Sequence, residues 1–497
     1  MTPTRIVLLA LLAWFGLAIF GHLDDPQLEI YDEARRAVSA LEMVEGKAPS
    51  WLTPSYYGQP DHWGTKPPLL VWCQAFWTAV LGPGELAVRL PSALATVLLC
   101  GLLIWWGRRD WGSPLSGALA ATAVLCNWAY MGNHGARTGD FDALLVLFLT
   151  AQVVFFYRFA TDGRWRDLVL ASGAVLLAGL TKGVAGGFLL PGVGLWFLLD
   201  PAARRRLPEP RLYLLPALAI GGVVAYYLAR ERVDPGYLQL VYENELGGRY
   251  ADTNENHRGP FWFYLRSLAF DPGWRHLLPL LLPALAYLLR QPAYRRGTLL
   301  LTVTAALFLA VISSAATKLY WYQSPVLPPL AMLIGAGCYH LAGALNERLR
   351  SPWVGAALLA GLFVAPMALT THHVLNARKY QETPLRKASF RAFLRKGEVQ
   401  PPYSVVIPDY NPNAHFYVDR RRYRGEDVTL KRVRRMFPPL VNDIQPQSTF
   451  AVGERAVVCH TETWQHLFDR FRLKVLVNDG RCKLVRLEAV RTDKVTD

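Results

Sequence analysis

Long apolar runs alternate with short polar segments along the chain up to about residue 371. A helix needs about 20 apolar residues to cross about 30 Å of hydrocarbon, so each run predicts one membrane-spanning helix. About eleven spans are predicted in this way. They lie near residues 6–22, 86–106, 113–131, 141–160, 168–181, 183–199, 212–229, 276–290, 298–315, 321–345 and 353–371. Only Thr181-Lys182-Gly183 separates 168–181 from 183–199, and one bent span is the alternative there.

Basic residues in the short loops predict the orientation. With the N-terminus in the cytoplasm, alternate loops carry arginine clusters, and short basic loops stay cytoplasmic. These clusters lie at 108–109, 164–166, 204–206, 290–296 and 348–350. The first run lacks a small-residue cleavage pattern before Asp24, so we interpret it as an uncleaved anchor, with a signal peptide as the alternative. Both the N-terminal anchor and the basic loops then place the long polar segments outside.

Three long segments depart from the membrane pattern. The first outer loop, 22–85, begins with an amphipathic stretch from Glu33 to Val44, which predicts a helix lying at the membrane interface. A second large outer loop covers 230–275. The tail, 372–497, alternates strand-like and helical stretches and predicts a small extracytoplasmic α/β domain after a membrane domain over 1–371.

Composition supports the membrane assignment. Hydrophobic residues make up 52% of the 497 residues and charged residues only 18%, below the roughly 25% of soluble domains. The net charge of +15 follows partly from the cytoplasmic loops, so it does not predict nucleic-acid binding. Cys459 and Cys482 both lie in the tail, where an oxidising compartment would permit a disulfide.

Charged residues at the predicted outer face are the candidates for function, because an ionisable group near the bilayer is costly. Asp32 follows the first span, and Lys66 precedes Pro67 and Pro68. Each has a structural alternative, since acids suit a helix start and a lysine can extend to the interface. Arg137, Asp140 and Asp142 lie where the fourth span opens, and further candidates on this face are Arg89, Lys182, Glu243, Glu245, His257 and Lys318.

This collection suits the transfer of a sugar from a lipid phosphate. The leaving phosphate needs fixed cations or a metal ion to stabilise its charge, and a neutral acceptor needs a carboxylate base. Asp32 is the candidate base, and Lys66, Arg89 and Lys318 are the candidate phosphate ligands.

The order of these motifs resembles that of the GT-C polyprenyl-phosphate-sugar transferases, which include lipid A aminoarabinose transferases and protein mannosyltransferase-like proteins. The matching segments span about residues 5–345. They are Asp32-Glu33-Ala34-Arg35, Lys66-Pro67-Pro68, Arg89-Leu90-Pro91-Ser92, Thr181-Lys182-Gly183, Asn256-His257, Pro260-Phe261-Trp262, and Lys318 with Tyr322 and Pro325.

The resemblance implies a membrane domain of about eleven to thirteen helices and an inverting transferase in the inner membrane, with its active site facing the periplasm. Asp32 would be catalytic, supported by Asp142 (or Asp140) and Arg137. Lys66, Lys318 and Tyr322 would surround the donor phosphate. The acceptor would be lipid A or another glycolipid, a polysaccharide or a protein.

One position departs from the family pattern. The aminoarabinose transferase has a glutamate directly before the lysine-proline pair, and this glutamate pairs with the loop histidine at a metal. Thr65 stands there in this chain. A divalent metal at His257 is therefore a prediction that lacks its expected partner, with Glu243 or Glu245 as substitutes.

Two other classes of protein remain as alternatives. A transporter or flippase of a lipid-linked or anionic substrate would place charges near the middle of the bilayer and often shows repeated halves. This chain groups its unusual charges at one face and has no evident repeat. A structural protein that displays the tail domain is the second of these alternatives.

Overall fold

The computed structural model describes residues 3–29, 31–132, 134–247, 257–376, 390–437 and 444–491. Contacts divide the chain into two compact units. The membrane unit comprises Met1–Leu23, Thr65–Leu70 and Arg89–Asn376. The loop–tail unit comprises Asp24–Gly64, Val71–Val88 and Ala377–Asp497, so residues of the first predicted outer loop belong with the tail.

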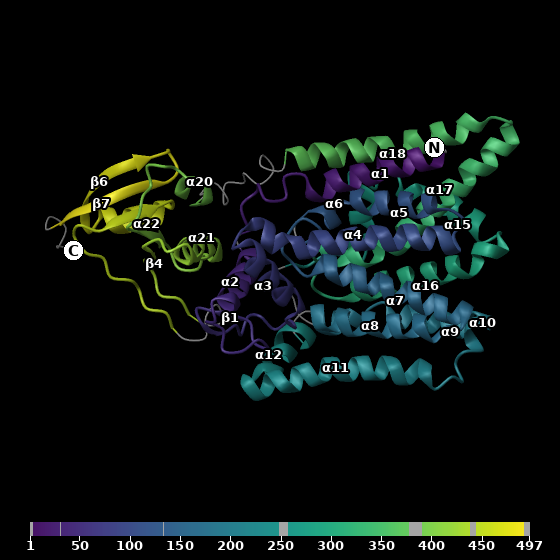
Figure 1. Cartoon of the computed structure of the whole chain (residues 1–497), viewed down its shortest axis with the longest axis horizontal. Helices are drawn as coiled ribbons and strands as arrows, with labels where there is room; N and C mark the ends of the chain where they lie inside the picture. Colours follow the sequence, from purple (N-terminus) through teal and green to yellow (C-terminus); the bar gives the residue numbers. More distant parts are fainter. Residues whose placement is uncertain are drawn as a thin grey trace. The chain divides into compact units, whose positions relative to one another are not determined.

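The membrane unit is helical (Figure 1). Among the described residues, seven helices are long and apolar enough to cross a membrane, and five apolar helices are shorter. The multi-span prediction is confirmed. The helices of this unit are α1 (Pro3–Phe20), α4 (Glu85–Asp110), α5 (Pro114–Cys126), α6 (Trp128–Met131), α7 (Asp142–Asp162), α8 (Trp165–Lys182), α9 (Leu190–Leu199), α10 (Pro201–Arg204), α11 (Arg211–Val233), α12 (Tyr237–Val241), α14 (Phe263–Phe270), α15 (Leu281–Leu288), α16 (Pro292–Ser314), α17 (Leu327–Leu349) and α18 (Pro352–Leu375).

Small side chains bring the central helices of this unit close together. An added Cβ at Gly335 of α17 would lie 2.5 Å from the Ala120 backbone nitrogen of α5. An added Cβ at Gly117 of α5 would lie 2.0 Å from the Leu103 carbonyl oxygen of α4. Apolar chains give lipid-embedded helices little hydrophobic drive to associate, so close backbone packing of this kind stabilises the bundle.

The helices break at the two places where the sequence indicates an interruption. A 3-10 turn over Gly183–Gly187 separates α8 from α9, so these are two helices and not one bent span. A second 3-10 segment, Tyr320–Val326, precedes α17. Pro328 and Pro329 lie in the first turn of α17, where a missing N–H costs no helix hydrogen bond.

The loop–tail unit contains a mixed five-stranded sheet with strand order β4-β3-β5-β7-β6. Strand β3 pairs in parallel with β4 and β5, whereas β7 pairs antiparallel with β5 and β6. The small sheet-containing region predicted for the tail is confirmed. The elements are α2 (Asp32–Val44), β1 (Ser55–Tyr56), β2 (Gln59–Pro60), α3 (Leu69–Leu81), α20 (Phe390–Leu394), β3 (Tyr403–Ile407), α21 (Pro412–Tyr423), β4 (Val428–Arg432), β5 (Arg455–Val458), α22 (Thr461–Phe468), β6 (Phe471–Asn478) and β7 (Lys483–Val490).

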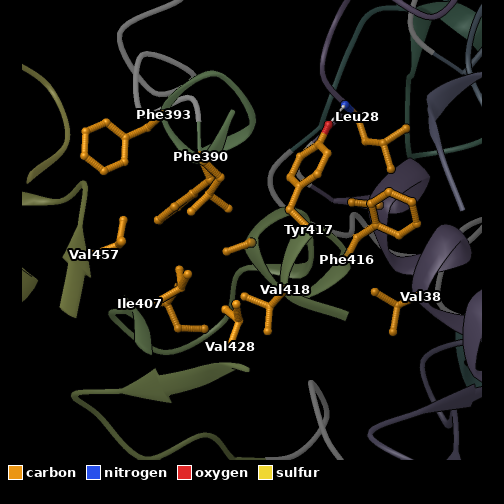
Figure 2. Close-up of a cluster of buried hydrophobic side chains, with 14 of the residues drawn as sticks. Leu28, Val38, Phe390, Phe393, Ile407, Phe416, Tyr417, Val418, Val428 and Val457 are labelled. Carbon is orange, nitrogen blue, oxygen red and sulfur yellow. Dashed lines mark hydrogen bonds between the residues drawn. The ribbon is translucent and has the colours of Figure 1, made fainter. Parts of the chain in front are cut away.

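A shared core joins the first loop to the tail within this unit (Figure 2). Val38 of α2 and Phe416 of α21 belong to the same buried cluster as Ile407 of β3. The Tyr417 hydroxyl accepts a hydrogen bond from the Leu28 backbone nitrogen at 3.1 Å. The predicted helix over 33–44 is present, but its apolar face packs against the tail, and nearly all of its residues are buried.

Two further features concern the predictions for this unit. Cys459 and Cys482 form a disulfide bond. Helix α3 was not predicted, because its 13 residues fall inside a segment assigned to the first outer loop. At 1.5 Å per residue it is too short to cross a bilayer unaided.

Candidate active site

A cavity of about 310 Å³ lies within the membrane unit. Four of its lining side chains are charged: Lys66, Asp142, Lys182 and Glu245. Most of the other lining residues are apolar or aromatic, including Tyr264, Trp321 and Tyr322. Charges act strongly in such surroundings because little water screens them.

Asp142 and Lys182 form an ion pair at one end of the adjacent helices α7 and α8. Asp142 is the first residue of α7, and Lys182 is the last residue of α8. A helix N-terminus stabilises an anion and a C-terminus stabilises a cation, so both charges suit their places. The Lys182 Nζ also lies 5.5 Å from the centre of the Tyr322 ring. The Asp142 Oδ2 is buried and accepts no hydrogen bond from the described residues.

Glu245 is the second carboxylate of the cavity. Its Oε1 accepts a hydrogen bond from the Thr65 hydroxyl at 2.7 Å and lies 3.4 Å from the Lys66 Nζ. The Tyr237 hydroxyl donates to the Thr65 carbonyl oxygen at 2.6 Å, which fixes the backbone next to Lys66. In the family pattern the residue before the lysine-proline pair is itself a glutamate. In this chain that residue is Thr65, and its hydroxyl binds the carboxylate of Glu245.

Gly183 continues the cavity wall from Lys182. Its φ of +57° favours glycine, and an added Cβ would lie 2.4 Å from the Tyr227 hydroxyl oxygen. The same Cβ would lie 3.9 Å from the Cδ of Pro67. The Thr181-Lys182-Gly183 motif therefore ends α8 with a turn that lets Pro67 and Tyr227 approach closely.

The loop before α7 carries Arg137, which was predicted to support catalysis. Arg137 donates hydrogen bonds to the carbonyl oxygens of Ala18, Ile19 and Gly21, and so satisfies the end of α1. Burial and the nearby Arg89 lower the pKa of Arg137 to about 10. Arg137 thus binds the end of α1 and does not line the cavity.

Asp140 binds the neighbouring histidine. Its carboxylate is buried and paired with the His134 Nδ1. Burial disfavours the charged carboxylate, but the charge and hydrogen bond of His134, the charge of Lys182 and the Phe141 backbone N–H together outweigh this effect and lower the pKa of Asp140. The His134 ring stacks on the ring of Trp321 with 4.1 Å between centroids, and Trp321 lines the cavity. Of the two predicted acids, Asp142 reaches the cavity directly and Asp140 supports its wall.

Two predicted phosphate ligands contact backbone carbonyls. The Lys318 Nζ donates to the carbonyl oxygens at the end of α16, including that of Ser313 at 2.7 Å, and burial lowers the pKa of Lys318. The Arg89 Nη1 donates to the Leu23 carbonyl oxygen at 2.8 Å. Neither residue lines the cavity. Lys66 and Tyr322, the other two predicted phosphate ligands, do line it.

His257 is exposed, and its carbonyl oxygen accepts a hydrogen bond from the Lys318 backbone nitrogen at 2.8 Å. It belongs to no group of three metal-ligating side chains among the described residues. Asn256, its neighbour in the motif, lies outside the described residues. Among the described residues, the donors at His257 therefore do not make up a metal site, and the proposed mechanism uses no metal.

Asp32, the predicted base, is the first residue of α2 in the loop–tail unit and is half-buried. Ion pairs fix this end of the helix. The Arg35 guanidinium binds the Asp61 carboxylate with a shortest distance of 2.6 Å, and Arg36 binds the same carboxylate at 3.2 Å. The Glu33 carboxylate accepts a hydrogen bond from the Glu29 backbone nitrogen at 2.7 Å.

Comparisons with known proteins identify the family of this chain. A sequence profile of the dolichyl-phosphate-mannose-protein mannosyltransferase family matches residues 65–227, a range that includes Lys66, Asp142 and Lys182. An undecaprenyl phosphate-alpha-4-amino-4-deoxy-L-arabinose arabinosyl transferase from Pseudomonas aeruginosa is 30% identical over 75% of this chain and 67% of its own length. The chain belongs to the GT-C family of lipid-phosphate-sugar glycosyltransferases.

Other relatives extend the comparison. A second arabinosyl transferase, from Pseudomonas fluorescens, is 32% identical over 70% of this chain and 58% of its own length. The chain thus spans between 58% and 67% of the length of these relatives. A crystal structure of ArnT from Cupriavidus metallidurans bound to undecaprenyl phosphate has the same fold, with a TM-score of 0.69 and 19% identity over 97% of this chain and 98% of that chain.

Sequence reasoning missed part of the cavity. Lys182 was a candidate on the outer face and a landmark of the family but had no predicted role, although a lysine next to a glycine at the end of an apolar run was a usable signal. Glu245 was one of two substitutes for the missing glutamate, and only the fold selects it. Nothing in the sequence identified Tyr227, Tyr237 or Tyr264 as neighbours of these charges.

Proposed function

We propose that this protein transfers a sugar from a polyprenyl-phosphate donor to an acceptor at the outer face of the inner membrane, with inversion at the anomeric carbon. The observation that carries this proposal is the pair of ammonium groups, Lys66 and Lys182, each beside a carboxylate, in a cavity whose other walls are mostly apolar or aromatic. Apolar walls suit an isoprenoid chain, and the ammonium groups suit its phosphate. Family membership supports a transferase and gives no support to the transporter or flippase.

The proposed donor phosphate binds at Lys66. It takes the ammonium group from Glu245, which remains held by the Thr65 hydroxyl. The bond between the anomeric carbon and the phosphate oxygen breaks, and the electron pair stays on the polyprenyl phosphate. Lys66 stabilises this developing charge, and Lys182 adds to the positive potential of the cavity.

The acceptor supplies the new bond. Its hydroxyl or phosphate oxygen attacks the anomeric carbon from the face opposite the leaving phosphate, which inverts the configuration. A hydroxyl acceptor loses its proton to a carboxylate, and we assign this role to Asp32 on the resemblance to the family. The resemblance favours a glycolipid such as lipid A as the acceptor.

The proposed orientation has the tail and the first outer loop in the periplasm. The Cys459–Cys482 disulfide supports this, because disulfides persist in oxidising compartments. The arginine clusters in alternate loops support it independently.

A reconstituted transfer assay tests the function. Purified protein in lipid nanodiscs receives undecaprenyl-phosphate aminoarabinose and lipid A, and mass spectrometry measures the modified product. We expect the wild-type chain to transfer the sugar and Asp32→Asn to lose at least about 10²-fold in rate, because the variant keeps the size of the side chain and removes the base. Folded Asp32→Asn that transfers at the wild-type rate would remove Asp32 from the mechanism.

The same assay separates donor from acceptor. Replacing lipid A by other acceptors, with release of undecaprenyl phosphate as the readout, shows whether the donor is used while the acceptor is wrong. If no polyprenyl-phosphate sugar is consumed with any acceptor, the proposed function is wrong.

A further inference from the structure

A second group of charged side chains is buried in the loop–tail unit, between α2 and α21. Glu42 is 2% exposed, His415 is 4% exposed and Asp419 is 3% exposed. One potential ligand atom from each residue lies within 4.8 Å of the other two. His415 and Asp419 are one helical turn apart and share a face of α21, whereas Glu42 comes from α2.

The hydrogen bonds of this group orient its side chains and leave a ring nitrogen unused. The Glu42 Oε2 accepts hydrogen bonds from the Ser55 hydroxyl at 2.6 Å and from the Gly58 backbone nitrogen at 3.1 Å. The His415 Nε2 lies 3.0 Å from the Asp419 Oδ2. The His415 Nδ1 is buried and has no hydrogen-bond partner among the described residues.

Surrounding rings fix the histidine. Its ring stacks on Tyr57 with centroids 4.3 Å apart and meets the edge of Tyr56 at 5.2 Å. Tyr57 lies in the turn between β1 and β2 that Glu42 also holds, so three elements converge on one point. Fixed ligand side chains with hydrogen bonds behind them are the usual support of a metal site.

The group has more acidic than basic side chains. The carboxyl groups of Glu42 and Asp419 are both buried beside a single histidine, and buried charges need an ionic partner or a metal ion. A protonated His415 is the simplest cation and would make the group a buried ion pair. A divalent metal is the other, since imidazole and carboxylate are both ligands of transition metals such as Zn²⁺.

We propose that Glu42, His415 and Asp419 bind a structural zinc ion that ties α2 of the first loop to α21 of the tail. Three protein ligands leave the fourth tetrahedral position to a water molecule. The site is independent of sugar transfer, and it lies in a different unit from His257. Its function is to hold the loop–tail unit together in addition to the core of Figure 2.

Metal analysis of the full-length protein provides the first test. We expect about one zinc ion per chain after purification without chelator. After chelation and dialysis, adding Zn²⁺ should raise the Tm by at least about 3 °C, because a ligand that binds only the folded state stabilises it. No retained zinc together with no change in Tm would show that the group is an ion pair only.

Variants locate the metal. Glu42→Gln and Asp419→Asn should each abolish the zinc-dependent change in Tm. The matched control is Glu85→Gln, which alters another buried carboxylate of this unit, one that binds Arg420 at 3.0 Å. This control should lower the Tm and keep the response to zinc. Loss of bound zinc in His257→Ala, with retention in Glu42→Gln and Asp419→Asn, would overturn the proposal in favour of the His257 site.

A spectroscopic test needs no variant and so does not depend on whether one folds. The wild-type chain freed of zinc is titrated with Co²⁺, and the intensity of the visible d–d bands is measured. A tetrahedral site of nitrogen and oxygen ligands should give intense bands that Zn²⁺ removes. A spectrum that stays that of aqueous Co²⁺ would contradict the proposal, whatever the outcome of the transfer assay.

Discussion

The helix pair α7 and α8 buries charged side chains at both ends, and the two ends differ in what the charges contact. At one end Lys182 binds Asp142 beside the cavity, and the Asp142 Oδ2 accepts no hydrogen bond from the described residues. Towards the other end the Arg158 guanidinium contacts three carboxylates, one from each of its nitrogens. They are those of Asp110 at 3.2 Å, Asp162 at 2.8 Å and Asp167 at 3.4 Å.

The difference indicates that Arg158 stabilises the fold, whereas Lys182 is available to bind a ligand. Each guanidinium nitrogen of Arg158 contacts a carboxylate, and these contacts connect the end of α4, α7 and the start of α8. Arg158 does not line the cavity. Lys182 borders open space next to the apolar wall and has donor capacity beyond its one carboxylate partner. Burial and pairing are common to both, so the adjacent cavity is the distinguishing feature.

The largest expected effect follows from the cavity end. Lys182→Gln removes a positive charge near the developing phosphate charge and should reduce the transfer rate by about 10²–10³-fold. The double variant Asp142→Asn/Lys182→Gln serves as the control for folding, since it leaves no unpaired buried charge. Both proteins are tested by transfer assay and thermal melting. Wild-type activity in a folded Lys182→Gln protein would place the donor elsewhere.

The opposite end should affect stability. Arg158→Gln leaves three acidic side chains without their cation and should cost about 3 kcal/mol, near the low end for a broken buried pair because Asp162 is partly exposed. Thermal unfolding measures the loss. The transfer rate per folded molecule should stay within about twofold of the wild type. Arg158 does not line the cavity, so its loss should act through folding. A selective loss of transfer at unchanged Tm would erase the distinction between the two ends.

A smaller effect is expected at Glu245. Glu245→Gln keeps an acceptor for the Thr65 hydroxyl and removes the carboxylate that competes with the donor phosphate for Lys66. We expect the KM for the donor to fall by about two- to fivefold, the range for a partly exposed ion pair. Initial rates at varied donor concentration measure it. An increased KM would indicate instead that Glu245 contacts the sugar.

The sequence predicted the membrane spans well because length and hydropathy determine them directly. Lys66, Asp142 and Tyr322 were candidates from the sequence because each lies in a short motif at the end of an apolar run, and all three line the cavity. The same signal assigned Lys318 and Arg89 to the phosphate. A lysine or arginine at a helix end can serve a ligand or a carbonyl oxygen equally well, and only the fold shows that these two contact carbonyls.

Pairings between distant segments were beyond sequence reasoning. The Thr65–Glu245 contact joins residues 180 positions apart, and a threonine gives no signal of its partner. The amphipathic pattern of α2 indicated an apolar face, but it is equally compatible with a lipid surface and with a protein partner. In the loop–tail unit that partner is α21 of the tail.

Binding of the donor lipid tests the central claim most directly. Radiolabelled undecaprenyl phosphate is titrated against wild type, the double variant Lys66→Ala/Lys182→Gln, and Arg158→Gln, each in nanodiscs and each shown to be folded. Our account predicts that the double variant loses at least about tenfold in affinity, because both ammonium groups of the cavity are gone, and that Arg158→Gln binds as wild type. Equal affinity of the wild type and the double variant would contradict the assignment of this cavity to the donor phosphate.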